Sequence, residues 1–154
     1  MLIGVPSEIK AQESRVGMTP AGVREAAAIG HSVLVEKGCG RRIGLTDEHY
    51  MEAGAILTDS AEEIFGSADM IVKVKEPQEC ECQWLRPKQL LFAYLHLAAD
   101  PRQAQLLMAS GATCVAYETV TSGLGYLPLL APMSVIAGKL SIQAGAYYLE
   151  ENQG

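Results

Sequence analysis

The chain has 154 residues, which suits one folded domain with a substantial core. Hydrophobic residues make up 49% of it, charged residues 19%, and the formal net charge is -6. This negative balance argues against a nucleic-acid partner, because phosphate binding needs clustered lysine and arginine. No apolar run reaches the ~18 residues of a membrane helix, and Met1 leads directly into a strand-like segment without a secretory signal. We therefore expect a cytoplasmic protein without a membrane partner.

Strand-length apolar runs alternate with helical patterns along the chain. The runs rich in β-branched or aromatic residues predict strands over residues 2–5, 32–36, 55–58, 70–75, 90–95 and 113–118. The amphipathic segments between them predict helices over residues 20–29, 47–53, 61–65 and 101–110. Proline at the first helical position and a closing glycine support two of these helices, at Pro20 with Gly30 and at Pro101 with Gly111.

Strands that alternate with helices predict right-handed crossovers and an α/β fold. We expect a largely parallel, doubly wound sheet of Rossmann or flavodoxin type with helices on both faces. The last element, Pro132–Glu150, is predicted to be a long helix with apolar residues all round, a pattern typical of a helix buried on several sides. We therefore divide the chain into an α/β domain at 1–131 and a connecting helix at 132–154.

The four cysteines do not have the spacing of a zinc site or a disulfide framework. They are Cys39, Cys80, Cys82 and Cys114. The Cys80–Cys82 pair, expected in a polar loop, is a weak candidate for metal or redox chemistry. We expect reduced thiols and no metal site.

Three polar residues follow predicted strands, in the region where ligands bind in a doubly wound sheet. Arg15 offers a planar fork for a carboxylate, and Lys75 a compact charge that can polarise a carbonyl. His96 can pass a proton near neutral pH, since the ordinary pKa of histidine is ~6.5. Together these residue types suit a small 2-keto or 2-amino acid.

Each of the three has a structural alternative. Arg15 could be a solvated or structural arginine, Lys75 could simply end a strand, and a histidine in an apolar run is commonly a satisfied core residue. Lys73 lies two residues before Lys75, on the same face of the predicted strand, so it competes for the same role.

Several long motifs, in order and spacing, resemble the amino-terminal part of NAD-dependent L-alanine dehydrogenases. They are IGVPSEIKAQESRVGMTP, VLVEKGCG, GLTDEHYMEAGA, ADMIVKVKEPQ, LLFAYLHLAADP, AYETV and LPLLAPMSVIAGKLSIQAGAYYLE. The soluble NAD-binding part of proton-translocating transhydrogenase shares the RV-x-x-TP opening but generally lacks equivalents of Lys75 and His96. Both residues are present here, which favours the alanine dehydrogenase side.

The resemblance implies a role for each candidate. Arg15 and Lys75 would hold the carboxylate of pyruvate or L-alanine, Lys75 would polarise the carbonyl, and His96 would act as acid and base. Met133 and Ser134 match positions that line the cofactor and substrate side of the cleft, although Ser134 could instead cap the final helix. Tyr94 and Glu118 are further cleft candidates, with core packing an equal explanation for Tyr94.

The family's NAD-binding domain follows this segment, and Gly154 comes before any glycine-rich cofactor loop. The nearest glycine cluster, Gly38–Gly44, does not fit G-x-G-x-x-G because Ile43 takes the third glycine position, so we expect a plain loop. We expect the substrate-binding half of an enzyme truncated before its cofactor domain, inactive alone and without tight binding of NAD. Alternatives are a non-catalytic carboxylate-binding or docking module, a transhydrogenase-like subunit, or a partner of a homo-oligomer or full-length relative.

Overall fold

The computed structural model describes residues 1–152 and divides the chain into two units, Met1–Ala116 and Tyr117–Gly154, which are described separately below. The last two residues of the segment expected at 132–154 lie outside the described residues.

The first unit is built on a six-stranded sheet in which every pair of neighbouring strands is parallel. The strands are β1 (Leu2–Val5), β2 (Ser32–Glu36), β3 (Ile56–Thr58), β4 (Met70–Val72), β5 (Leu90–Ala93) and β6 (Thr113–Ala116). Their order is β3-β2-β1-β4-β5-β6, which is the Rossmann order and not the flavodoxin order. The predicted α/β class is confirmed. The order reverses between β1 and β4, so a crevice for ligands is expected beyond their carboxyl ends.

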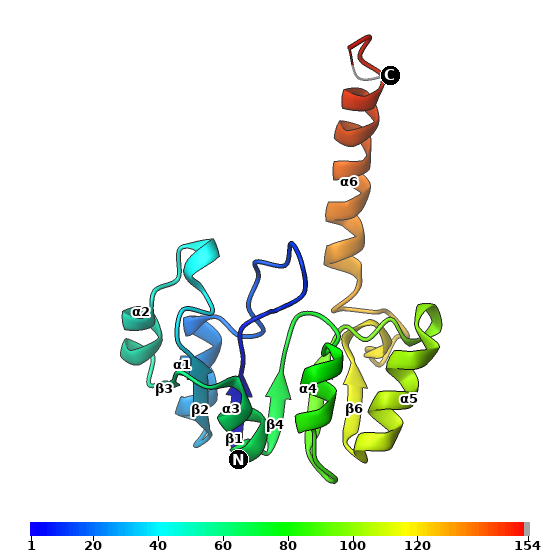
Figure 1. The fold of residues 1–154 in the computed structure, drawn as a ribbon. Coiled ribbons are helices and arrows are strands. Elements are labelled where there is room, and N and C mark those ends of the chain that lie inside the picture. Colours follow the sequence, from blue (N-terminus) through cyan, green and yellow to red (C-terminus); the bar gives the residue numbers. More distant parts are fainter. Residues whose placement is uncertain (153–154) are drawn as a thin grey trace. The chain divides into compact units, whose positions relative to one another are not determined.

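Five helices cover the two faces of this sheet (Figure 1). They are α1 (Pro20–Ala28), α2 (Asp47–Glu52), α3 (Ala61–Ser67), α4 (Glu79–Trp84) and α5 (Pro101–Ser110). Two short 3₁₀ turns, η1 (Arg41–Ile43) and η2 (Leu97–Ala99), lie in loops. Helix α4 was not predicted, because its sequence ECECQW spans fewer than two helical turns and ends in a single large apolar residue, Trp84.

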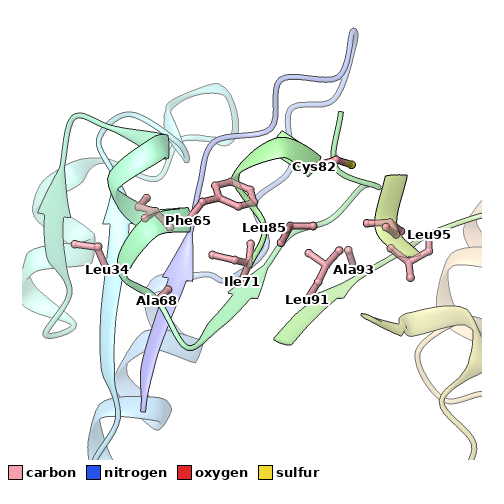
Figure 2. Packing of buried hydrophobic residues seen from close by; sticks show 11 residues of the cluster. Leu34, Phe65, Ala68, Ile71, Cys82, Leu85, Leu91, Ala93 and Leu95 are labelled. Atoms are coloured by element: carbon pink, nitrogen blue, oxygen red, sulfur yellow. The ribbon is translucent and has the colours of Figure 1, made fainter. Parts of the chain in front are cut away.

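Alternating strand residues feed two hydrophobic cores, as the two-residue period of a strand requires. Helices α1 and α2 cover one core, to which β1 contributes Ile3 and Val5. Helices α3, α4 and α5 cover the other, whose packing Figure 2 shows. Gly4 of β1 faces this second core so closely that an added Cβ would lie 2.5 Å from Ile64. The absence of a side chain at Gly4 therefore allows α3 to pack directly on the sheet.

Three predicted strands end earlier than expected, and the difference matters for the site. The strand expected over 70–75 ends at Val72, the one over 90–95 ends at Ala93, and the one over 113–118 ends at Ala116. After Val72 the chain bends, and the Val74 N–H donates a hydrogen bond to the Glu8 side chain instead of to a neighbouring strand. Strand-like hydrogen bonds nevertheless continue, since the Lys73 N–H donates to the Phe92 carbonyl and the Tyr94 N–H, just after β5, donates to the Val74 carbonyl.

The second unit contains the 3₁₀ turn η3 (Tyr117–Thr119) and the helix α6 (Ala131–Tyr148). Helix α6 agrees with the long helix predicted over 132–150, within two residues at each end. Within residues 1–152, no helix is both long and apolar enough to cross a membrane.

Candidate functional site

The three candidate residues of the first unit all follow strands in the middle of the sheet. Arg15 lies in the loop that joins β1 to α1, Lys75 lies in the bend after β4, and His96 lies between β5 and η2. Because the strands are parallel and neighbouring, their carboxyl ends meet at one edge. This edge includes the point where the strand order reverses, and all three residues lie in segments that leave it.

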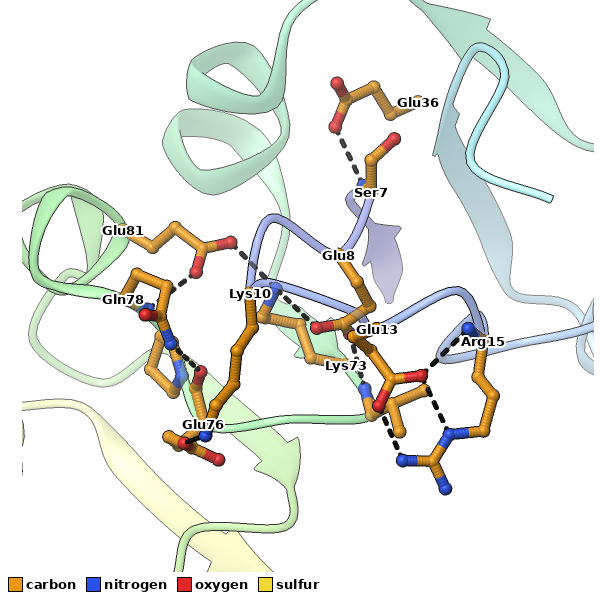
Figure 3. Close-up of polar contacts among 12 residues, drawn as sticks. Ser7, Glu8, Lys10, Glu13, Arg15, Glu36, Lys73, Glu76, Gln78 and Glu81 are labelled. Atoms are coloured by element: carbon orange, nitrogen blue, oxygen red, sulfur yellow. Dashed lines mark hydrogen bonds and ion pairs between the residues drawn. The ribbon is translucent and has the colours of Figure 1, made fainter. Parts of the chain in front are cut away.

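Arg15 is held by a neighbouring carboxylate, that of Glu13. Its Nε donates to Glu13 Oε1 over 2.8 Å and its Nη2 to Glu13 Oε2 over 2.6 Å (Figure 3). The Arg15 backbone N–H donates to the same carboxylate. These hydrogen bonds lower the pKa of Glu13 to about 2 and raise that of Arg15. The guanidinium therefore has a fixed direction at neutral pH.

A small polar cavity of about 160 Å³ lies beside this pair. Its walls come from the loop after β1 and the loop after β2, and they include Ser7, Ser14, Arg15 and Arg42. Arg42 also donates to the Glu13 backbone carbonyl over 3.3 Å, which joins the two loops. The cavity can accept a small polar ligand beside the Arg15 guanidinium.

Lys73, the alternative candidate to Lys75, is fully buried and forms ion pairs with two carboxylates. Its side chain is 1% exposed, and its Nζ lies 2.8 Å from Glu81 Oε1 and 3.2 Å from Glu8 Oε2 (Figure 3). The contact with Glu8 is an ion pair without hydrogen-bond geometry. Burial raises the pKa of Glu8, an effect that the Lys73 ammonium opposes. Lys75 is only partly buried, so it is the more accessible of the two lysines.

His96 has an unusual backbone conformation, with φ 50° and ψ 35°. A non-glycine residue in this left-handed region is uncommon and costs on the order of 1 kcal/mol. Its ring stacks on that of Tyr94, with centroids 6.1 Å apart and planes 15° apart, a separation within the range of attractive aromatic pairs. This stacking gives the Tyr94 side chain a role in orienting the imidazole.

Gly17 brings the loop that carries Arg15 against the end of β4. A Cβ at this position would lie 2.3 Å from the Val72 carbonyl oxygen and 3.0 Å from the Lys73 Cα. Backbone atoms cannot swing aside as a flexible side chain can. A glycine is therefore needed for the β1–α1 loop and the lysine-bearing bend to lie this close.

Met133 and Ser134 lie in the first turns of α6, in the other unit, so they are not placed with the residues above. The alternative role of Ser134 as a helix cap is wrong. The residue at the N-cap position is Leu130, and the Ser134 hydroxyl donates back to the Leu130 carbonyl over 3.3 Å. Glu118 lies in η3, which directly follows the carboxyl end of β6 and belongs to the same unit as α6.

The described residues do not fit the pyrophosphate of a dinucleotide. In the Rossmann arrangement a glycine-rich turn after the first strand leads directly into a helix N-terminus. Here the turn after β1 carries the buried Glu8 carboxylate, and α1 begins only at Pro20. Gly38–Gly44 forms a loop with η1, as expected. Among residues 1–152 no cluster of three metal-ligating side chains is found, and all four cysteines are free thiols.

Three carboxylates that organise the site were not predicted from the sequence. For Glu13, the available signal was its position two residues before Arg15. Glu8 lies two residues before Lys10 but pairs with the distant Lys73. Glu81 gave no such signal, because it belongs to α4, the helix that was missed.

Comparison with known proteins gives a consistent picture. The profile of the family described as "Alanine dehydrogenase/PNT, N-terminal domain" matches residues 4–137. The whole chain is 51% identical to the alanine dehydrogenase of Methanococcus maripaludis and 47% identical to that of Mycobacterium tuberculosis, and it spans 41% and 42% of them. All of it also aligns with a solved L-alanine dehydrogenase, at 49% identity and a TM-score of 0.91, over 42% of that chain.

A more distant solved structure, a transhydrogenase from Sinorhizobium meliloti, shares the fold. It is 24% identical with a TM-score of 0.72, and the alignment covers 77% of this chain and 35% of that one. The chain thus spans about two fifths of the length of the alanine dehydrogenases it matches.

Proposed function

Because the chain belongs to the alanine dehydrogenase/PNT N-terminal domain family, we propose that it binds pyruvate and L-alanine as the substrate-holding part of an NAD-dependent alanine dehydrogenase. The observation that carries this proposal is the position of Arg15, Lys75 and His96 at one edge of the sheet, after β1, β4 and β5. The identity of 47–51% with alanine dehydrogenases over the whole chain supports it.

In this proposal Arg15 and Lys75 bind the substrate carboxylate. Glu13 holds the Arg15 fork in a fixed direction, so little conformational freedom is lost when the carboxylate binds. Arg15 supplies planar hydrogen-bond donors and Lys75 a compact charge. The Lys75 ammonium also polarises the C2 carbonyl of pyruvate, because a positive charge stabilises the electron density that collects on that oxygen.

His96 acts as the acid and base. It gives a proton to the substrate oxygen or nitrogen at C2 during reduction and takes one in the reverse direction. Stacking on Tyr94 and the left-handed backbone fix the direction of its ring. When bound, NAD supplies the hydride acceptor for oxidation of the C2–H bond.

Met133 and Ser134 are proposed to line the side of the cleft shared by substrate and cofactor. The described residues offer no pyrophosphate site, so we expect no formation of NADH from L-alanine by the 154-residue chain alone. The free thiols agree with the cytoplasmic location that we propose. Association with further copies, or with a full-length relative, is also proposed.

Titration of the chain with pyruvate, followed by NMR of the histidine rings, tests the proposal. We expect a saturable shift of the His96 ring signals and none at His31, which lies beside the amino terminus at the other end of the sheet. Lys75→Met should weaken pyruvate binding at least about tenfold, since it removes a charge-assisted hydrogen bond. Lys88→Met, which changes a lysine before β5, is the matched control and should bind as the parent does. No saturable shift at His96 would refute the proposal.

A further inference from the structure

The segment that carries Lys75 is fixed on both sides by carboxylates that share one buried cation. Before Lys75, the Val74 N–H donates to Glu8 Oε1 over 2.6 Å. After it, the Gln78 N–H donates to Glu81 Oε2 over 2.7 Å. The remaining oxygen of each carboxylate faces Lys73 Nζ, at 3.2 Å and 2.8 Å. One ammonium thus joins two carboxylates, and each of these binds the backbone on one side of Lys75 (Figure 3).

Two further contacts fix the same segment. Lys10, from the loop after β1, forms an ion pair with Glu76, the residue that follows Lys75. Gln103 of α5 donates to the Pro77 carbonyl over 2.9 Å. The backbone around Lys75 is therefore tied to three different elements, while the Lys75 side chain is only partly buried.

Lys73 itself is not placed to bind a substrate. Its side chain is 1% exposed, and the two carboxylates beside it are 1% and 2% exposed. A substrate carboxylate would have to displace one of these anions from a buried ammonium. Stability alone does not explain the cluster of Lys73, Glu8 and Glu81, because a buried ion pair commonly stabilises a fold no more than hydrophobic residues of the same volume do. The hydrogen bonds of this cluster, however, converge on the segment from Val74 to Gln78, which contains Lys75.

We propose that Lys73, Glu8 and Glu81 form a positioning triad, which sets the place and direction of Lys75 for the substrate carboxylate. In this proposal the triad does not bind the substrate, although Glu8 also lines the cavity beside Arg15. The triad acts through the two backbone hydrogen bonds at Val74 and Gln78, and Lys73 holds both carboxylates in the direction of these N–H groups. This role of the triad rests on the proposed function of Lys75. The two backbone hydrogen bonds at Val74 and Gln78, called the backbone clamp below, are a property of the fold.

Two measurements on the 154-residue chain separate these statements. Hydrogen exchange of the Val74 and Gln78 amides reports the clamp directly, with or without a ligand. The Kd for pyruvate, taken from NMR signals of the folded chain only, reports the consequence for binding. In Lys73→Met we expect both amides to exchange at least about tenfold faster. The Kd for pyruvate should rise at least about tenfold, which corresponds to the loss of one charge-assisted hydrogen bond from a misplaced Lys75.

Glu81→Gln is a milder second variant. Its amide oxygen can still accept from the Gln78 N–H, but the ion pair with Lys73 is lost. We expect a smaller change of the same sign in both readouts, and this variant serves if Lys73→Met does not fold.

Gln89→Met is the matched control, because it also removes a buried polar side chain. Gln89 is 3% exposed and donates to the carbonyls of Phe65 and Ala68, over 2.8 Å each, at the opposite end of β5. This variant should lose stability and keep both the amide protection in the Lys75 segment and the parent Kd.

The outcomes distinguish the inference from the proposed function. If Lys73→Met and Glu81→Gln lose stability but keep the parent Kd and amide protection, as Gln89→Met does, the triad is merely structural and the inference is overturned. If exchange accelerates but the Kd stays at the parent value, the positioning role is also overturned. Absence of pyruvate binding by the parent chain would refute the proposed function instead. In that case the hydrogen exchange of the Val74 and Gln78 amides would be the test of the backbone clamp.

Discussion

Replacement of Lys73 by methionine should destabilise the fold strongly and in a way that depends on pH. The methionine fills much of the lysine volume but leaves Glu8 and Glu81 buried without their shared cation. Removing one partner of a buried ion pair costs about 3–5 kcal/mol. A domain of this kind has a total stability of about 5–15 kcal/mol, so the variant should keep a folded state with a much lower free energy of unfolding.

The pH dependence follows from the pKa of Glu8. Burial already raises this pKa, and the Lys73 ammonium opposes the rise, so removing the ammonium raises it further. The folded variant then binds a proton more tightly than the unfolded chain does. Its stability therefore increases as the pH falls through the folded-state pKa of Glu8 and is lowest above it. The cost of Lys73→Met should be larger at pH 7 than at pH 5.

Urea unfolding followed by the fluorescence of the single tryptophan, Trp84, measures this cost, and an unchanged m-value verifies that the same surface unfolds. Lys37→Met is the matched control. Lys37 also forms an ion pair, with Asp59, but both side chains are well exposed, and such a pair contributes about 0–1 kcal/mol. The reasoning would be refuted if Lys73→Met cost no more than Lys37→Met, or if its cost were the same at both pH values.

Two other substitutions test the contacts around the cavity. Gly17→Ala should lower both the melting temperature and the pyruvate affinity, because its Cβ would lie 2.3 Å from the Val72 carbonyl oxygen; Gly66→Ala, where an added Cβ meets nothing within 4 Å, is the control and should not destabilise the fold. Equal melting temperatures for the two variants would contradict this account. Glu13→Gln should cost about 1 kcal/mol of stability at neutral pH, a value reduced by the partial exposure of Arg15. The pKa of Glu13 is lowered to about 2 in the folded chain, so the difference in urea unfolding should shrink as the pH falls from about 4.5 toward 2; a difference independent of pH would count against the ion pair.

The fold could be predicted from the sequence because its main signals are local. Apolar runs identify the strands, and a proline at the first helical position with a closing glycine identifies helices α1 and α5. The ends of the strands were predicted less accurately. Strand β4, for example, ends at Val72, because the N–H of Val74 donates to the carboxylate of Glu8, which is distant in the sequence. A pattern of hydrophobic residues does not contain such a contact.

The candidate site was predicted only in part for the same reason. Residues that follow strands could be assigned to one edge of the sheet, but the choice between Lys73 and Lys75 could not be made from spacing alone. It depends on burial and on Glu81, which lies in the short helix α4. Likewise, the pairing of Arg15 with Glu13 occurs in a loop, where no hydrophobic period indicates how the side chains lie.

Calorimetric titration with pyruvate tests the central claim most directly, by comparing the parent chain with the variant Arg15→Gln/Lys75→Met/His96→Gln. The proposed function predicts a saturable binding heat for the parent chain and none for the triple variant, with both chains folded by circular dichroism. Pyruvate binding by the triple variant with the parent Kd would show that these three residues do not form the substrate site.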